Sequence, residues 1–337
     1  MKKFSKIIGI ALLSLTIFSC SDDDNNTPAQ QTITDIAVAN PDLSILVTAL
    51  TRTNLAGTLD GSGQYTVFAP TNAAFTTFFT SLGANVTVNN VDVNVLKAIL
   101  LNHVIGSEIK STVIPSATYA STLSPINATT NAPTITMFVQ KAGATVTLNG
   151  GIDSKGAVVT TADVDASNGV IHIVNRVIQI PTLVDHVVDN PEFDTLQAVV
   201  TSTSGAFGDQ SAVLNALNGL TATAPGTLFA PNNAAFTAAT TGNGFLTGSA
   251  VTAANVTRVL QYHVLDGIAG NVRSSAITTT LQNLPTRAMM PQLNVGVQLN
   301  PTAKIKDTQN IVADIILVDV QGSNGVIHGV NKVLRPF

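Results

Sequence analysis

Residues 66–75 read TVFAPTNAAF, and residues 227–236 read TLFAPNNAAF. The two stretches agree at eight of ten positions, although the second begins 161 residues after the first. Such self-similarity indicates an internal repeat, so it decides the number of domains before any other pattern is weighed.

Two further stretches recur in the same order around this one. Asn40-Pro41-Asp42-Leu43 is echoed by Asn190-Pro191-Glu192-Phe193. Residues 168–178 (NGVIHIVNRVI) match residues 324–334 (NGVIHGVNKVL) at eight of eleven positions. We therefore predict two copies of one domain, at residues 32–180 and 181–337, with the break at Ile180-Pro181-Thr182.

The first stretch has the composition of a strand that ends at a corner. Residues 66–68 are β-branched or aromatic and favour a strand, whereas Pro70 cannot donate to a sheet ladder and marks its end. Thr71-Asn72 supplies side-chain oxygens that can cap a helix start. We predict a strand-to-helix corner, with Phe68 and Phe75 packed in one core.

Each copy carries two histidines in apolar surroundings. His103 and His263 each end a run of apolar residues spaced i, i+3, i+4, i+7, which places both on the buried face of a helix. His172 and His328 follow an Asn-Gly pair, which suits left-handed backbone angles in a turn. With strands predicted at residues 144–148 and 311–320, each copy is helix-rich first and strand-rich second.

The N-terminus has the pattern of an export signal. Three lysines precede a twelve-residue apolar run, residues 7–18, which is too short to span a bilayer and long enough for a secretory signal. Cys20, the only cysteine, resembles the acylated residue of a bacterial lipobox, although bulky Phe18 stands where that box usually has a small residue. We predict a lipoprotein signal peptide at residues 1–19 and a lipidated Cys20; a free thiol in an ordinary signal peptide is the alternative.

An acidic tether follows, so residues 20–31 form the lipidated cysteine and its spacer. Asp22 to Asp24 directly after the cysteine are similar to the signal by which one group of Gram-negative bacteria sends lipoproteins to the outer face of the outer membrane; a plain soluble spacer is the alternative. Without residues 1–19 the chain has 13 basic and 20 acidic side chains, a net charge of −7. This charge argues against nucleic acid as a partner.

The repeated stretches, in their content and order, resemble the fasciclin-like domain. The resemblance occurs twice and covers essentially the whole mature chain. The resemblance implies an α+β fold: two tandem fasciclin-like domains, each a small twisted β-wedge packed with several short helices. It also implies an extracellular role in adhesion to cells, matrix or polysaccharide. The motif residues, which we interpret as fold-specifying, are Thr66, Phe68, Pro70, Asn72, Phe75, Asn168, Gly169 and His172 in the first copy, and Thr227, Phe229, Pro231, Asn233, Phe236, Asn324, Gly325 and His328 in the second.

One family feature is present in the second copy alone. The family carries a Tyr-His pair that is implicated in receptor binding in some animal members, and Tyr262-His263 matches it, whereas the first copy has Asn102-His103. We keep Tyr262 and His263 as candidate interaction residues. A structural role in the core is the competing interpretation, because helical spacing already places both histidines on an apolar face.

No motif for catalysis, a metal or a cofactor is found. There is no HExxH, no serine with glycine at both −2 and +2, and no glycine-rich loop with a following lysine. The stretch that begins at Asp163 resembles a calcium loop, but its glycine comes one residue late and Val174 takes the place of the bidentate Glu. Asp185, His186 and Asp189 are interpreted as a solvated polar cluster near the domain junction.

The sequence therefore predicts a non-enzymatic, surface-tethered adhesion or interaction module. Its partners would be the membrane, through the N-terminal acyl anchor, and an extracellular protein or polysaccharide. The alternative is a carrier or sensor that binds a small apolar ligand between the β-wedge and its helices.

Overall fold

The computed structural model describes residues 30–129, 131–242, 244–266, 270–288 and 292–337. The predicted signal peptide, Cys20 and the acidic run lie outside the described residues. Residues 32–180 and 181–337 are called the first and second repeat below.

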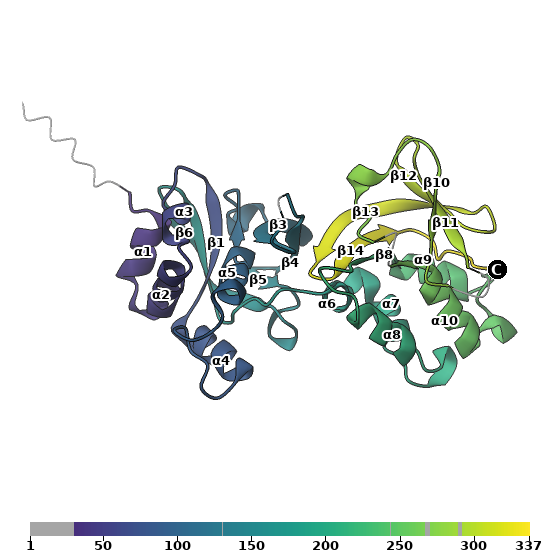
Figure 1. Ribbon diagram of the computed structural model, residues 1–337, viewed down its shortest axis with the longest axis horizontal. Coiled ribbons are helices and arrows are strands. Elements are labelled where there is room, and N and C mark those ends of the chain that lie inside the picture. The colour runs from purple at the N-terminus through teal and green to yellow at the C-terminus, as the bar shows by residue number, and fades with distance from the viewer. Residues whose placement is uncertain (1–29, 130, 243, 267–269, 289–291) are drawn as a thin grey trace, which may run out of the picture. The chain divides into compact units, whose positions relative to one another are not determined.

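The first repeat closes seven strands into a barrel in the order β1 to β7, and its first and last strands pair in parallel. Its helices α1, α2 and α3 precede the barrel, and α4 and α5 lie between β1 and β2 in sequence (Figure 1). The elements are α1 (Ile33–Ala39), α2 (Ser44–Arg52), α3 (Ala56–Leu59), β1 (Tyr65–Pro70), α4 (Asn72–Leu82), α5 (Val93–Asn102), β2 (Val104–Ile105), β3 (Ala117–Pro125), β4 (Thr134–Ala142), β5 (Thr145–Leu148), β6 (Ala157–Ala166) and β7 (Gly169–Val174).

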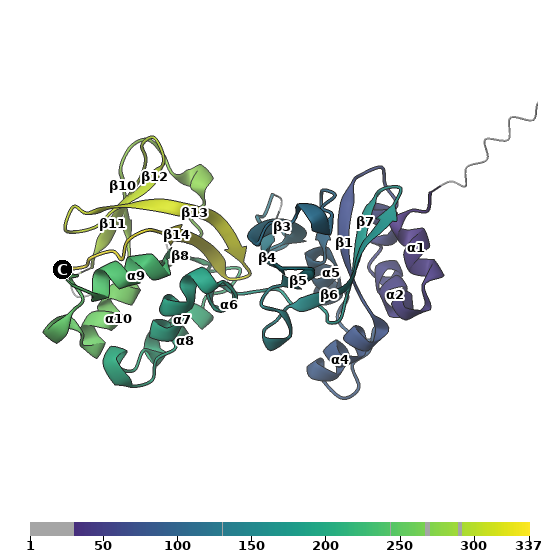
Figure 2. The same ribbon diagram turned by 180° about the vertical axis from the view of Figure 1, so that it is seen from behind.

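The second repeat follows the same plan with a seven-stranded sheet in the order β10-β11-β12-β13-β14-β8-β9. Figures 1 and 2, seen from opposite sides, show its helices gathered on one face of the strands β8, β13 and β14. The elements are α6 (Leu183–Asp189), α7 (Asp194–Val200), α8 (Ser211–Asn218), β8 (Gly226–Pro231), α9 (Asn233–Thr240), α10 (Ala253–Tyr262), β9 (Val264–Leu265), β10 (Gln282–Pro285), β11 (Asn294–Leu299), β12 (Ala303–Lys306), β13 (Val312–Gly322) and β14 (Gly325–Val330). The predicted α+β class is confirmed.

The predicted strand-to-helix corner is present in both repeats. Strand β1 ends at Pro70, and the Thr71 hydroxyl then accepts from the backbone N–H of Ala74 at 3.3 Å, which caps α4. In the second repeat Asn232 caps α9 in the same way, at 2.9 Å from Ala235 N. Phe68 and Phe75 are both buried, but they belong to two different apolar clusters, so the prediction that they share one core is wrong.

Asn72 does not cap its own helix, contrary to the prediction. Its Oδ1 accepts from the N–H of Ile45 at 2.9 Å, and its Nδ2 donates to the carbonyl of Pro41 at 2.9 Å. The side chain therefore ties the start of α4 to the start of α2, which lies 27 residues earlier. Asn233 repeats this tie in the second repeat, with Thr195 N and Pro191 O as its partners.

The Asn-Gly pair builds the hairpin between β6 and β7 and fastens the first helix to it. Gly169 takes a φ of +143°, and a Cβ there would lie 2.0 Å from the Tyr65 carbonyl oxygen, so glycine is required. Asn168 accepts from Ile33 N at 2.9 Å and donates to the carbonyl of Leu59. Asn324 makes the equivalent bonds with Leu183 N and Leu217 O, at 2.9 and 3.0 Å.

No single helix within the described ranges is long and apolar enough to cross a membrane. One strongly bent pair, Ile33–Ala39 with Pro41–Arg52, reaches the required length and composition only when its two parts are taken together.

We expect Asn168→Ala to lower the free energy of unfolding by roughly 2–4 kcal/mol, because it leaves the buried Ile33 N–H and Leu59 carbonyl without their partner. Urea unfolding of the soluble chain measures the change. Asn324→Ala, the matched change in the second repeat, should cost a similar amount. The exposed Asn89→Ala should change stability by less than about 0.5 kcal/mol. Unchanged stability in Asn168→Ala would contradict the fold-specifying role of this residue.

Candidate functional site

The helix-end histidines are bonded to the backbone on both sides of the ring. His103 Nδ1 lies 2.7 Å from the carbonyl of Ile99, and its Nε2 accepts from the N–H of Ile178 at 2.9 Å. His263 repeats both bonds, with Val259 O at 2.7 Å and Leu334 N at 2.9 Å. Each ring thereby clamps the helix end to the segment that follows the last strand of its repeat.

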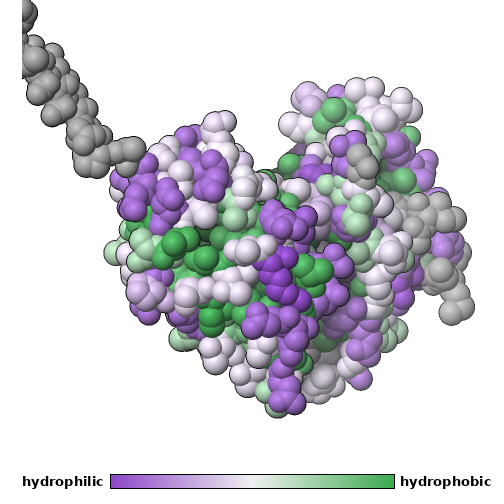
Figure 3. Space-filling model, turned by 60° about the vertical axis from the view of Figure 1, so that its left-hand side comes forward, coloured by the Kyte–Doolittle hydropathy of each residue, from purple (hydrophilic) through white to green (hydrophobic). Residues whose placement is uncertain are grey.

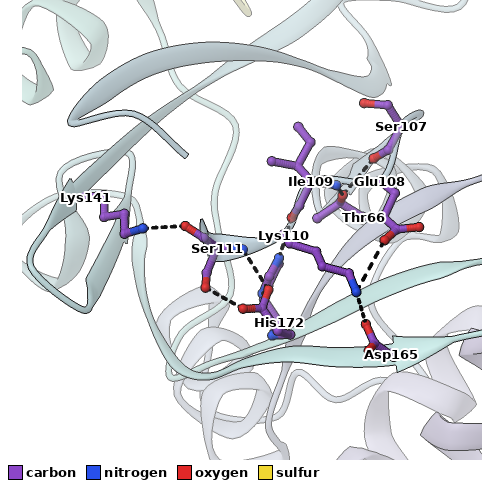
Figure 4. A network of polar contacts seen from close by, with 10 residues as sticks. Thr66, Ser107, Glu108, Ile109, Lys110, Ser111, Lys141, Asp165 and His172 are labelled. Atoms are coloured by element: carbon purple, nitrogen blue, oxygen red, sulfur yellow. Dashed lines mark hydrogen bonds and ion pairs between the residues drawn. The ribbon is translucent and has the colours of Figure 1, made fainter. Parts of the chain in front are cut away.

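The strand histidines form a second clamp, which Figure 4 shows for His172. His172 Nε2 lies 2.9 Å from the carbonyl of Ile109, and its Nδ1 accepts from the N–H of Asp163 at 3.2 Å. Asp163 in turn accepts from the backbone N–H of Ser111 at 2.7 Å. The Lys141 Nζ donates to the Ser111 carbonyl at 2.6 Å. The network therefore joins strands β4, β6 and β7 to the segment at residues 109–111.

Both strand histidines use a bulged aspartate that sequence analysis did not single out as structural. Asp163 and Asp319 have φ values of +60° and +59°, and each bonds the N–H of a serine, Ser111 or Ser274. An aspartate nine residues before the histidine in both copies is the sequence signal that could have found them. Asp163 is thus committed to a backbone contact rather than to a calcium loop.

Burial keeps all four histidines neutral near pH 7. Burial lowers the pKa of His103 and of His263 to about 4, and it also lowers the pKa of His172 and His328. Because both ring nitrogens of each histidine already face backbone groups, no nitrogen is left to bind a metal or transfer a proton.

Tyr262, the other candidate interaction residue, is engaged as well, and the described chain shows no metal-binding cluster. No group of three or more His, Cys, Asp or Glu side chains in these ranges is arranged to hold a metal ion. Tyr262 is 0% exposed and donates to the carbonyl of Asn294 at 2.9 Å, and burial raises its pKa to about 12. Tyr262 and His263 therefore lie in the core, where a partner protein cannot touch them.

The cluster at the start of the second repeat is buried, which contradicts the predicted solvated surface. His186 is fully enclosed, with Nε2 3.4 Å from the carbonyl of Gln321, and burial lowers its pKa to about 4. Asp189 is 5% exposed, and neither carboxylate oxygen has a hydrogen-bond partner among the described residues. A Cβ at Gly150 would lie 2.3 Å from its Oδ1.

Asp185 lies one helical turn before Asp189 and, unlike Asp189, has partners for its carboxylate. Its carboxylate accepts from the N–H of Thr182 at 2.7 Å in a capping box and pairs with Lys155 Nζ at 2.9 Å. Burial, by contrast, is the main cause that raises the pKa of Asp189 to about 6. The nearby Ser154 hydroxyl, which does not reach hydrogen-bond geometry, and Lys155 lower this pKa, whereas Asp185 raises it further.

The space between helices and strands is filled in both repeats. Free volume there is about 10 Å³ in the first repeat, near Leu46 and Val67, and about 10 Å³ in the second, near Leu196 and Leu228. A volume of this size holds about one water molecule at most. Among the described residues, these two places therefore offer no groove of the kind that the carrier alternative requires between the β-wedge and its helices.

Exposed apolar side chains are found on the surface of the first repeat. Leu82 at the end of α4 and Val95 in α5 border a shallow hollow of about 520 Å³, together with Val86 and Val91. Figure 3 shows one face of the molecule, on which hydrophobic side chains form separate patches between polar ones.

The repeated motifs and the duplicated plan agree with one family. The fasciclin domain model matches residues 41–181 and again residues 198–336. This chain belongs to the fasciclin domain family. The matched family is one of adhesion-type domains that are generally not catalytic.

Similar fasciclin proteins come from several bacteria. Protein sll1483 of Synechocystis sp. is 32% identical over 158 residues, which cover 46% of this chain and 77% of that protein. The cell surface glycolipoprotein MPB83 of Mycobacterium bovis is 41% identical over 85 residues, 24% of this chain and 37% of that protein. A fasciclin relative is thus a lipid-bearing protein of the cell surface.

A solved structure that this chain matches is the FAS1 domain pair from the insect cell adhesion molecule Fasciclin I. It is 17% identical, covers 90% of this chain and 95% of that chain, and has a TM-score of 0.47.

We expect Asp189→Asn to raise the free energy of unfolding by roughly 2 kcal/mol at pH 7, because it removes a buried charge that has no partner. The folded-state pKa of about 6 lies above the ordinary value of 3.8, so the folded protein holds a proton that the unfolded chain has already released. Wild-type stability therefore rises as pH falls from about 6 towards 4 through this group, and the gain from Asn shrinks at pH 5.

Asp185→Asn is the matched control on the same helix. It weakens a helix cap and an ion pair, so stability should fall by about 1 kcal/mol at pH 7. Urea unfolding at pH 5 and pH 7 measures both variants. A loss of stability in Asp189→Asn at pH 7 would show that the carboxylate is paired in solution.

Proposed function

We propose that this protein is a lipid-anchored surface protein whose two fasciclin domains act as a non-catalytic adhesion or interaction module. One observation carries the proposal. The side chains of the repeated motifs make hydrogen bonds or pack inside their own repeat. In the described chain this leaves the outer surface, rather than a reactive pocket, as the place where function resides.

The proposed mechanism is display of many copies at the cell surface. Acyl chains on Cys20 would hold the N-terminus in the membrane, and the acidic tether would give the folded repeats reach. Many copies on one cell would convert weak individual contacts into useful avidity. The glycolipoprotein relative supports a surface location, and the family supports an extracellular protein or polysaccharide as the partner.

We place the anchor in the outer face of the outer membrane of a Gram-negative bacterium. This proposal rests on the acidic residues Asp22 to Asp24 directly after the cysteine.

The adhesion role is tested by binding the soluble chain, residues 21–337, to arrays of glycans and matrix proteins. We expect saturable binding to at least one ligand class, and heat-unfolded protein as the control should not bind. Leu82→Ser/Val95→Ser then tests whether the exposed α4–α5 hollow takes part in the contact. Silence of the folded protein on every surface would overturn the adhesion role.

The anchor is tested by cell fractionation and surface labelling of cells that express the full chain. Cys20→Ala should move the protein out of the membrane fraction and abolish surface labelling, because no acyl chain can be attached. Replacing Asp22, Asp23 and Asp24 with Asn should keep the protein in the membrane and abolish only the surface label. Unchanged membrane attachment of Cys20→Ala would remove the lipoprotein proposal.

A further inference from the structure

The barrel of the first repeat contains a pocket of about 220 Å³, which is separate from the α4–α5 hollow. Its floor is formed by buried side chains, among them Phe68, Ile114 and Val139. Its mouth lies at Val113, which is 70% exposed, and at Pro115. Because protein interiors are close-packed, a pocket of this size within a core is a feature to be accounted for.

The lining is mainly apolar and carries no charged side chain. Thr118 and Tyr119 are the polar residues of the lining, and the Tyr119 hydroxyl is engaged at 3.0 Å by the side-chain amide of Asn190. A charged group placed here would lose its hydration without finding an opposite charge. The lining chemistry therefore selects an uncharged, largely apolar occupant with at most one hydroxyl.

The wall at the mouth is fixed before any ligand arrives. His172 holds the carbonyl of Ile109, and Lys141 Nζ holds the carbonyl of Ser111 (Figure 4). The N–H of Lys141 also donates to the carbonyl of Ser116 at 3.0 Å. Because both ends of this wall are bonded to the barrel, the pocket is preformed, which lowers the cost of ordering on binding.

The second repeat carries a larger side chain at the corresponding position. Ala120 pairs with Met137 in the first barrel, and Leu284 pairs with Val295 in the second sheet. The register is anchored at the bulged aspartates Asp163 and Asp319, because six residues earlier Ala157 and Ala313 pair with Leu148 and Ile305. Leu148 and Ile305 pair in turn with Val139 and Val297. Ala120 and Leu284 are therefore equivalent.

A second residue difference between the repeats also gives the first barrel less side-chain bulk than the second sheet. The first repeat has Asn102 where the second has Tyr262, whose ring is part of the apolar core of the second sheet. The apolar core of the first barrel gains no ring from Asn102, because this side chain donates to the carbonyls of Ile178 and Gln179.

We infer that the barrel of the first repeat binds a small uncharged apolar molecule of about the size of a substituted benzene ring. An apolar cavity of roughly 150 Å³ holds benzene, so about 220 Å³ has room for a ring with one or two small substituents. This site is separate from the proposed adhesion surface and does not depend on it.

The test uses the soluble chain, residues 21–337, with toluene and p-cresol as uncharged probes and benzoate as a charged probe of similar size. Binding is followed by methyl NMR, with the resonances of Ile114 and Val139 as reporters. We expect saturable shifts of these methyl groups with both uncharged probes and none with benzoate.

Ala120→Leu fills the pocket with the side chain that the second repeat already carries, so it should fold and should weaken binding at least roughly tenfold. Ser121→Leu adds the same side chain at the next, exposed position of β3 and should bind as the wild type does. Thermal unfolding checks that both variants are folded. If Ala120→Leu does not fold, Val139→Phe, which adds bulk from the floor of the pocket on the neighbouring strand β4, takes its place with the same expected loss, and Ile114 is then the reporter.

Three results would overturn the inference. They are the absence of saturable binding of either uncharged probe, equal affinity of the wild type and the pocket-filling variant, and binding of benzoate as tight as that of toluene. Each of these results would leave the adhesion proposal untouched, because the glycan and matrix arrays test a different surface.

Discussion

The parallel pairing of the first and last strands is the constraint on which each repeat depends. β1 pairs with β7 over six residues, from Tyr65–Gly169 to Pro70–Val174, and β8 pairs with β14 in the same register. The first signature stretch of each copy thus lies directly beside the second. The two stretches that define the repeat in sequence are neighbours in space, and this explains why both are retained in both copies.

The polar side chains of the motifs act as ties around this strand pair. Asn168 joins the hairpin to α1, Asn72 joins α4 to α2, and His172 joins β7 to the loop at Ile109. Every one of these bonds ends on a backbone group of another element. A short helix has few residues with which to bury its own ends, so its position is set by such ties as much as by apolar packing.

Local patterns in the sequence were sufficient to predict the corner at Pro70, the buried faces of the histidine helices and the duplicated α+β plan. They failed where burial is decided by distant residues. Asp189 is enclosed beside Gly150, 39 positions away, and His186 contacts Gln321, 135 positions away. Helical spacing around Asp185 carries no trace of either neighbour. The pocket at Ala120 was equally beyond reach, since its equivalence to Leu284 appears only when the strand register is known.

The closing strand also has a consequence for how the chain acquires its structure. The partner strand of β1 lies about a hundred residues downstream. Neither repeat can therefore complete its sheet until its last strand, β7 or β14, has been synthesised. Contacts of such long range slow folding, because a large loop must close before the pairing stabilises it. A ribosome or a secretion channel that releases the chain from its N-terminus would therefore deliver the first repeat as an open, unfinished sheet until residue 174 has emerged.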